Sequence, residues 1–231
     1  MSLIRLERAA IVVPFRLPFT LLTLAVLAAF GLWTRSAYSE LPRRAIEQVG
    51  FAPRDLLGFG WGRLFNSALF THGELEFWAA VAMVLFAVGI AEWFTGTAFA
   101  AVTFWGVHLA TLIVESVFVA LPLKLAGLAI GAQILDLRDV GPSAGYVGAL
   151  GVVCAMLPGR WRYAASAAVI GVLVYIGFAP DVDDLSMAAI MSATIAHLIA
   201  FPLGFAAYTV WRRVRAGNTA MPTTTAPVEP I

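Results

Sequence analysis

Cysteine and charge are both scarce in this sequence. Its 231 residues include one cysteine, Cys154, and only 13% are charged, whereas a soluble protein averages about 25%. A single thiol excludes a disulfide framework within the chain. The 15 Lys and Arg residues nearly balance the 14 Asp and Glu residues, and no basic stripe suited to nucleic acid is present. These absences argue against an ordinary soluble protein and against a nucleic-acid-binding protein.

Apolar residues make up 61% of the chain and gather in long runs. A membrane-spanning helix needs roughly 17 to 25 mostly apolar residues, because its backbone polar groups must be satisfied inside the hydrocarbon. Six stretches meet or approach that length: 17–33, 77–94, 98–121, 143–157, 163–178 and 186–211. The sequence therefore predicts an all-α integral membrane protein with six transmembrane helices, of which the fourth is short.

Arginines flank these runs on one side. They precede the first run (Arg5, Arg8 and Arg16), join the fourth to the fifth (PGRWR, 158–162) and follow the sixth (WRRVR, 211–215). Such residues mark the cytoplasmic ends of membrane helices. We therefore expect a multi-pass protein of the inner (plasma) membrane with both termini cytoplasmic. A membrane domain would cover residues 1–215, and the polar, proline-bearing residues 216–231 would form a disordered cytoplasmic tail.

The segment DVGPSAGYVGALG (139–151) places a serine at the start of the short fourth helix. Gly141 permits a tight turn and Pro142 suits a first helical position. Ser143 lies about 15 residues, or about 22 Å, from the cytoplasmic end of its helix. Because the hydrocarbon core is about 30 Å thick, this helix is expected to start inside the membrane. His197 lies at a similar height on the sixth run. A serine with a histidine in reach can act as a nucleophile, but a serine among small residues also suits close helix packing.

Two further ionisable groups fall in the third run. His108 and Glu115 are seven residues apart and share a helix face. They could form a polar clamp between helices or, with His197, the proton relay of a transporter. No internal repeat of the kind that many transporters show is evident. Glu92, near the end of the second run, is expected to anchor that helix end.

Four motifs, in order, resemble those of the rhomboid superfamily of intramembrane proteins. WGRLFNSALFTHG (61–73) is similar to the family's Trp-Arg and Phe-x-His-Gly, through Trp61, Arg63 and His72. GIAEWFTG (89–96) matches a Glu-x-x-x-Gly through Glu92 and Gly96. GPS (141–143) matches the Gly-x-Ser of helix 4, and AHLIAFPLG (196–204) carries His197 at the position of the base and Gly204 at that of a packing glycine. The resemblance covers about residues 15–212.

This resemblance implies a six-helix rhomboid-like bundle that cleaves transmembrane substrates as a serine protease. Ser143 would be the nucleophile and His197 the general base and then the general acid. Gly141, His108 and Tyr146 are candidates for polar support. No cofactor and no metal are expected, and the partners would be the lipid bilayer and a transmembrane protein substrate or membrane-protein partner, with no nucleic acid.

The chain departs from the family pattern where the oxyanion would bind. Active rhomboids carry a second His and an Asn after the first His; here Glu76 or Phe77 and Ala80 or Val81 stand near those positions. Losing one oxyanion donor typically lowers the rate about 10²- to 10³-fold. Ala144, Val147 and Ala200 also differ from the usual residues. A catalytically inactive rhomboid-fold protein, which binds transmembrane helices or belongs to a larger membrane complex, is therefore the alternative.

Overall fold

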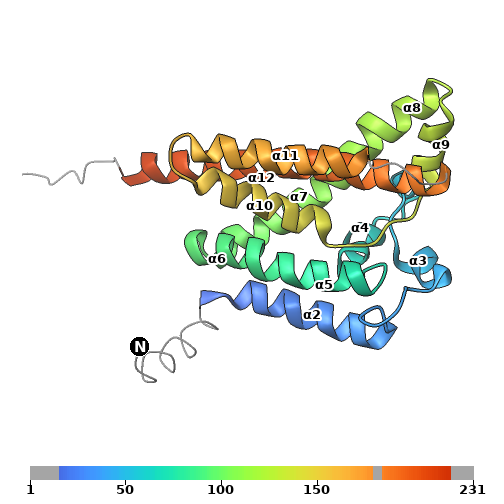
Figure 1. Cartoon of the computed structure of the whole chain (residues 1–231), viewed down its shortest axis with the longest axis horizontal. Coiled ribbons are helices and arrows are strands. Elements are labelled where there is room, and N and C mark those ends of the chain that lie inside the picture. The colour runs from blue at the N-terminus through green and yellow to red at the C-terminus, as the bar shows by residue number, and fades with distance from the viewer. Residues whose placement is uncertain (1–15, 179–183, 220–231) are drawn as a thin grey trace, which may run out of the picture.

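A computed structural model of the chain describes residues 16–178 and 184–219. Within these ranges the chain is helical and no strand forms (Figure 1). The elements are α2 (Pro18–Thr34), α3 (Arg43–Val49), η1 (Pro53–Leu56), α4 (Gly62–Asn66), η2 (Ser67–Leu69), α5 (Glu74–Met83), η3 (Val84–Val88), α6 (Gly89–Thr95), α7 (Thr97–Glu115), η4 (Ser116–Ala120), α8 (Leu121–Leu125), α9 (Ala129–Asp136), α10 (Ser143–Met156), α11 (Trp161–Gly177) and α12 (Asp184–Thr219).

The six apolar runs coincide with helices, as the sequence predicts. Three of these helices, 74–95, 97–125 and 187–217, are long and apolar enough to cross a membrane. The first two are continuous through the π-helical segments η3 and η4. The apolar helices α2, α10 and α11 are shorter, and α10, with 14 residues, is the shortest of the three. An all-helical chain with several apolar helices is thus confirmed.

The two long connections are more ordered than the sequence suggests. The connection before α5 holds α3, η1, α4 and η2, and the one before α10 holds α8 and α9. Apart from α8, which continues the long helix 97–125, these helices have only three to eight residues each, too few to give a run of spanning length. At the C-terminus α12 continues to Thr219, and the remainder of the predicted tail, 220–231, lies outside the described residues, as do Arg5 and Arg8.

Helix α10 lies in the middle of the bundle because its small residues let its neighbours approach. It packs against α7 on one side and α12 on the other. A Cβ on Gly145 would lie 2.6 Å from the ring of Phe104, and one on Gly148 would lie 2.6 Å from Val107. Gly151 lies against the backbone of Phe201. Glycine is therefore needed along this helix for close approach, which fixes the position of Ser143 at its first turn.

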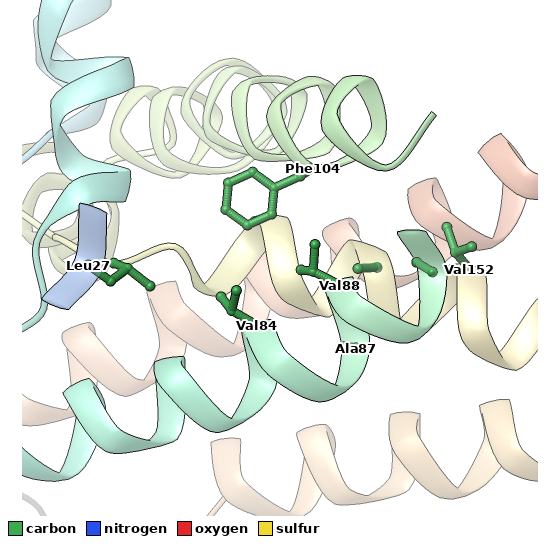
Figure 2. Packing of buried hydrophobic residues seen from close by; sticks show 8 residues of the cluster. Leu27, Val84, Ala87, Val88, Phe104 and Val152 are labelled. Carbon is green, nitrogen blue, oxygen red and sulfur yellow. The ribbon is translucent and has the colours of Figure 1, made fainter. Parts of the chain in front are cut away.

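The largest hydrophobic core cluster joins α10 to the N-terminal half of the bundle. Its residues come from α2, η3, α6, α7 and α10. Figure 2 shows Phe104 above Val84 and Val88, with Leu27 at one side and Val152 at the other. Between helices in a bilayer, such packing stabilises through close van der Waals contact, because lipid is as apolar as these side chains. The core therefore holds α10 against α2 and η3, not only against α7 and α12.

Arginines and acidic residues are distributed unequally between the two ends of the bundle. The start of α2, the α10–α11 turn and the end of α12 lie at one end, which carries Arg16, Arg160, Arg162, Arg212, Arg213 and Arg215 (Figure 1). Aromatic rings cover some of these cations: the Arg16 guanidinium lies 4.8 Å from the ring centre of Trp93, and that of Arg215 lies 4.7 Å from the ring centre of Trp211. At the other end, arginines are mixed with acidic residues.

Candidate functional site

A small polar cavity lies where α7, α10 and α12 meet the N-terminal connection. Its volume is about 30 Å³. Polar side chains from each of these parts line it: Ser67, His108, Glu115, Asp139, Ser143 and Ser192. Gly141, Ala144 and Ala196 complete the wall around Ser143. We call this the Ser143 cavity.

Ser143 enters the cavity because it is the first residue of α10. Gly141, two residues earlier, has a φ of 150° that favours glycine, and its N–H donates to the Ser67 carbonyl at 2.8 Å. Pro142 caps the helix. The predicted helix start at Ser143 is therefore observed. The Ser143 side chain makes no hydrogen bond to any described residue.

His197 lies on α12 next to the cavity wall. Its neighbour Ala196 lines the cavity together with Ser143. His197 itself is not a lining residue. Its Nε2 atom is buried and has no hydrogen-bond partner among the described residues. The structure thus places Ala196, the neighbour of His197, at the wall of the Ser143 cavity, shows no hydrogen bond between Ser143 and His197, and leaves their catalytic roles a prediction.

His108 does line the cavity. It is 2% exposed, and its Nε2 is 3.1 Å from the carbonyl oxygen of Leu64 on α4. Its Nδ1 is buried without a hydrogen-bond partner in the described part of the chain. The ring of Trp105 stands perpendicular to the His108 ring, at 6.2 Å between centres. His108 is therefore held in one orientation with one free nitrogen.

Glu115 closes the far side of the cavity. The Ser192 hydroxyl on α12 donates to its carboxylate at 2.5 Å, and both residues are buried. His108 and Glu115 thus bind different partners and join α7 to α4 and to α12, respectively. The predicted polar clamp between helices is confirmed. A buried carboxyl that keeps one hydrogen-bond partner is a stable arrangement, since leaving it unpaired would be costly.

Residues 138–141, just before Ser143, are bound on both sides by the N-terminal connection. Asp139 and Phe51 exchange backbone hydrogen bonds at 2.9 and 3.0 Å, and the Asp139 carboxylate is 2.7 Å from Nε2 of His72. That hydrogen bond raises the pKa of His72 above its usual value of 6.5, against the opposing effect of burial. Asp139 also accepts from the Val140 N–H. Sequence reasoning assigned no role to Asp139, although the residue stands four before Ser143.

Arg138 holds the same segment from its other side. Its guanidinium donates to both carboxylate oxygens of Asp55, at 2.7 and 3.1 Å, and to the Gly50 carbonyl at 2.9 Å. Burial acts to raise the pKa of Asp55, but the hydrogen bonds from Arg138 and from the Ala52 N–H, with the charges of Arg138 and Arg63, hold it below its usual value. This paired, charge-assisted contact is the strong kind, and it orients the chain that leads into α10.

The remaining motif residues occupy structural positions. Trp61 is exposed at the start of α4, and Arg63 donates to the Glu47 carbonyl at 3.1 Å. Glu92 accepts hydrogen bonds from the first turn of α2 and from Thr97, so it anchors two helix ends. Gly96 ends α6 with a φ of 91°. The others pack: Gly204 against α10, and half-buried Tyr146 against two core clusters.

The resemblance places Glu76 or Phe77 near the second His of rhomboids, and Ala80 or Val81 near their Asn. Phe77 is buried and lies against Gly31 of α2. Ala80 is buried, whereas Glu76 is exposed in the first turn of α5. None of these residues lines the Ser143 cavity. Any oxyanion donor near Ser143 must therefore come from another part of the chain.

No group of three or more His, Cys, Asp or Glu residues with metal-binding geometry occurs within 16–178 and 184–219. Searches against models of protein families, curated proteins and solved structures find no match to this chain. The likeness to rhomboids therefore remains a prediction from the four quoted motifs.

Proposed function

We propose that the protein is a rhomboid-like intramembrane serine protease that cleaves transmembrane substrates through Ser143 and His197. The observation that carries the proposal is the position of Ser143: it opens a short helix inside the bundle and lines a cavity of polar groups. Ionisable residues inside a membrane helix bundle, such as His108 and Glu115 in this cavity, are costly and are functional candidates by default. The buried, unpartnered ring nitrogen of His197 on the adjacent helix is the accompanying feature.

The expected chemistry is acyl transfer. His197 takes the proton of the Ser143 hydroxyl as Oγ attacks the scissile carbonyl, and then returns that proton to the leaving amine. Hydrogen bonds of this kind are often long or poorly aligned before substrate binds and tighten only in the complex. Backbone N–H groups of the first turn of α10 have no partner within the helix, so they would replace the missing oxyanion donors.

A six-span arrangement fits this activity. The three shorter apolar helices α2, α10 and α11 run alongside the three long ones (Figure 1). With the arginine-rich end in the cytoplasm, Ser143 would lie toward the opposite surface, from which water reaches it. Helix α11 and the N-terminal connection would border the route of substrate entry.

The test is cleavage in proteoliposomes of a panel of single-span substrates. Wild-type protein should cleave at least one of them, and the Ser143→Ala and His197→Ala variants should not. The Ser166→Ala variant is a matched control, because Ser166 lies on α11, away from the cavity, and its hydroxyl donates within its own helix to the Arg162 carbonyl. Equal cleavage by wild-type protein and Ser143→Ala would refute the proposal.

A second candidate function is a non-catalytic rhomboid-fold protein that binds transmembrane helices or serves as a subunit of a membrane complex. The observation that favours it is the absence of a second His and an Asn after His72, where Glu76 or Phe77 and Ala80 or Val81 stand. It predicts a stoichiometric membrane partner that copurifies equally with wild-type protein and with a Ser143→Ala, His197→Ala double variant. Proteolysis by the purified protein alone would exclude it.

A further inference from the structure

The protonation pattern of His108 follows from its contacts. A carbonyl oxygen can only accept a hydrogen bond, so the Nε2 atom that contacts Leu64 must carry a proton. In the neutral imidazole the other nitrogen, Nδ1, is then a hydrogen-bond acceptor and a base. That Nδ1 is buried and has no partner among the described residues, although buried polar atoms are nearly always hydrogen-bonded.

His108 lines the Ser143 cavity, so a molecule held there could donate to Nδ1. Two of the hydroxyls that line the cavity are already used: Ser67 donates to the Leu64 carbonyl at 3.4 Å, and Ser192 donates to Glu115. The third, on Ser143, makes no hydrogen bond to a described residue. The volume of about 30 Å³ is enough for a water molecule, which needs about 10–15 Å³ and two to four polar partners. Ser143, His108, Glu115 and Asp139 supply them.

We propose that the Ser143 cavity binds the hydrolytic water and that His108, through Nδ1, is the base that activates it. This inference rests on the proposed protease function and assigns its second half-reaction to a second histidine. His197 would serve acylation, in which Ser143 attacks the peptide. His108 would serve deacylation, in which water attacks the ester.

The deacylation step balances with these groups alone. A water O–H bond breaks as its proton passes to Nδ1 of His108, and the oxygen forms a bond to the acyl carbon of the Ser143 ester. The bond between that carbon and Oγ of Ser143 then breaks, and Oγ takes the proton back from Nδ1. The products are the carboxylic acid of the cleaved chain and the free Ser143 hydroxyl. The Nε2 proton stays on the His108 ring throughout, and its hydrogen bond to the Leu64 carbonyl orients the ring.

The His108→Gln variant removes the basic nitrogen of His108 but can keep its hydrogen bond to Leu64. A glutamine amide places an N–H close to the position of Nε2, so it can keep the hydrogen bond to Leu64, but it has no basic nitrogen. Thr111→Val is the matched control. Thr111 lies on the same helix, is buried, and its hydroxyl has no hydrogen-bond partner in the described ranges, but it does not line the cavity.

The experiment follows hydrolysis of a p-nitrophenyl ester by the full-length protein in lipid nanodiscs. For His108→Gln we expect a burst of p-nitrophenol equal to the amount of enzyme, followed by steady turnover about 10²- to 10⁴-fold slower than wild type. Hydroxylamine, a nucleophile that needs no base, should release the trapped acyl group and restore turnover. Thr111→Val should behave as wild type.

Other results would overturn the role of His108. Wild-type turnover in His108→Gln, or a loss of its burst, would overturn the role of His108 in deacylation while leaving the Ser143 protease intact. Slow turnover in Thr111→Val as well would show that the effect is structural, and it would also overturn the assignment. A wild-type protein that forms no acyl-enzyme at Ser143 would overturn both the water site and the proposed function.

Discussion

Gly204 of α12 lies against the backbone of Gly148 of α10, so that a Cβ on Gly204 would overlap the Gly148 carbonyl oxygen. The partner atoms are backbone and cannot move aside. This contact sets the distance between the helix that carries Ser143 and the helix that carries His197. We therefore expect Gly204→Val to lower the free energy of unfolding by about 3 kcal/mol or more, at or beyond the usual upper range for overpacking, and to abolish activity.

Thermal unfolding in detergent measures this effect, with Gly171→Val as the control. A Cβ at Gly171 of α11 would meet nothing within 4 Å, so that variant should unfold near the wild-type temperature. Equal loss of stability in both variants would show that the α10–α12 contact has no special role.

Glu92 supports the start of α2 from another helix. Its carboxylate accepts hydrogen bonds from the N–H of Phe19 and from the N–H and hydroxyl of Thr20, at 2.6 to 2.9 Å. Glu92→Ala leaves these donors without a partner, at a cost of about 1–3 kcal/mol for each buried donor. We expect a large fall in unfolding temperature, a smaller one for Glu92→Gln, and almost none for Glu76→Gln, since Glu76 is exposed. Similar values for all three would contradict this role.

The ion pair of His72 and Asp139 predicts a pH-dependent stability. Because the hydrogen bond to Asp139 raises the pKa of His72 in the folded protein above 6.5, protonated His72 stabilises the fold fully below pH 6.5. This contribution is lost as pH rises through the raised pKa. The unfolding temperature of wild type relative to His72→Gln should therefore fall between pH 6 and pH 8. Parallel profiles for the two proteins would rule out the ion pair as a source of stability.

The proposed six-span topology predicts which side of the membrane each end faces. Cys154 is the only cysteine and is buried, so single cysteines can be introduced at exposed positions without a background signal. A membrane-impermeant maleimide should label Leu57→Cys in right-side-out vesicles, and it should label Arg160→Cys only after the vesicles are opened. Labelling of both cysteines in sealed vesicles would contradict the topology.

Much of this architecture is predictable because apolar runs are local signals. The helices at 77–94, 98–121 and 143–157 follow from hydropathy, and the start of α10 follows from Gly141 and Pro142. The close approach at Gly204 agrees with the small-residue pattern. The helices α3 and α9 do not follow, since neither presents an apolar run long enough to be recognised.

The hydrogen-bond partners of the polar residues cannot be predicted from the local sequence. Glu92 bonds to Thr20, 72 residues away, and His72 bonds to Asp139, 67 residues away. Nothing in the sequence near Glu92 or Asp139 specifies these pairings, which depend on how the helices pack. The separation of His108 from Glu115 follows the same logic: their spacing shows a shared face, but not that one bonds to α4 and the other to α12.

Covalent labelling by a fluorophosphonate is the most direct test of Ser143 as a nucleophile. We expect the wild-type protein, reconstituted in lipid, to carry one phosphonyl group, which mass spectrometry of its peptides places on Ser143. The His197→Ala variant should react far more slowly, and Ser143→Ala should not react. A wild-type protein that stays unlabelled, or a label that persists in Ser143→Ala, would contradict the central claim that this chain is a serine protease.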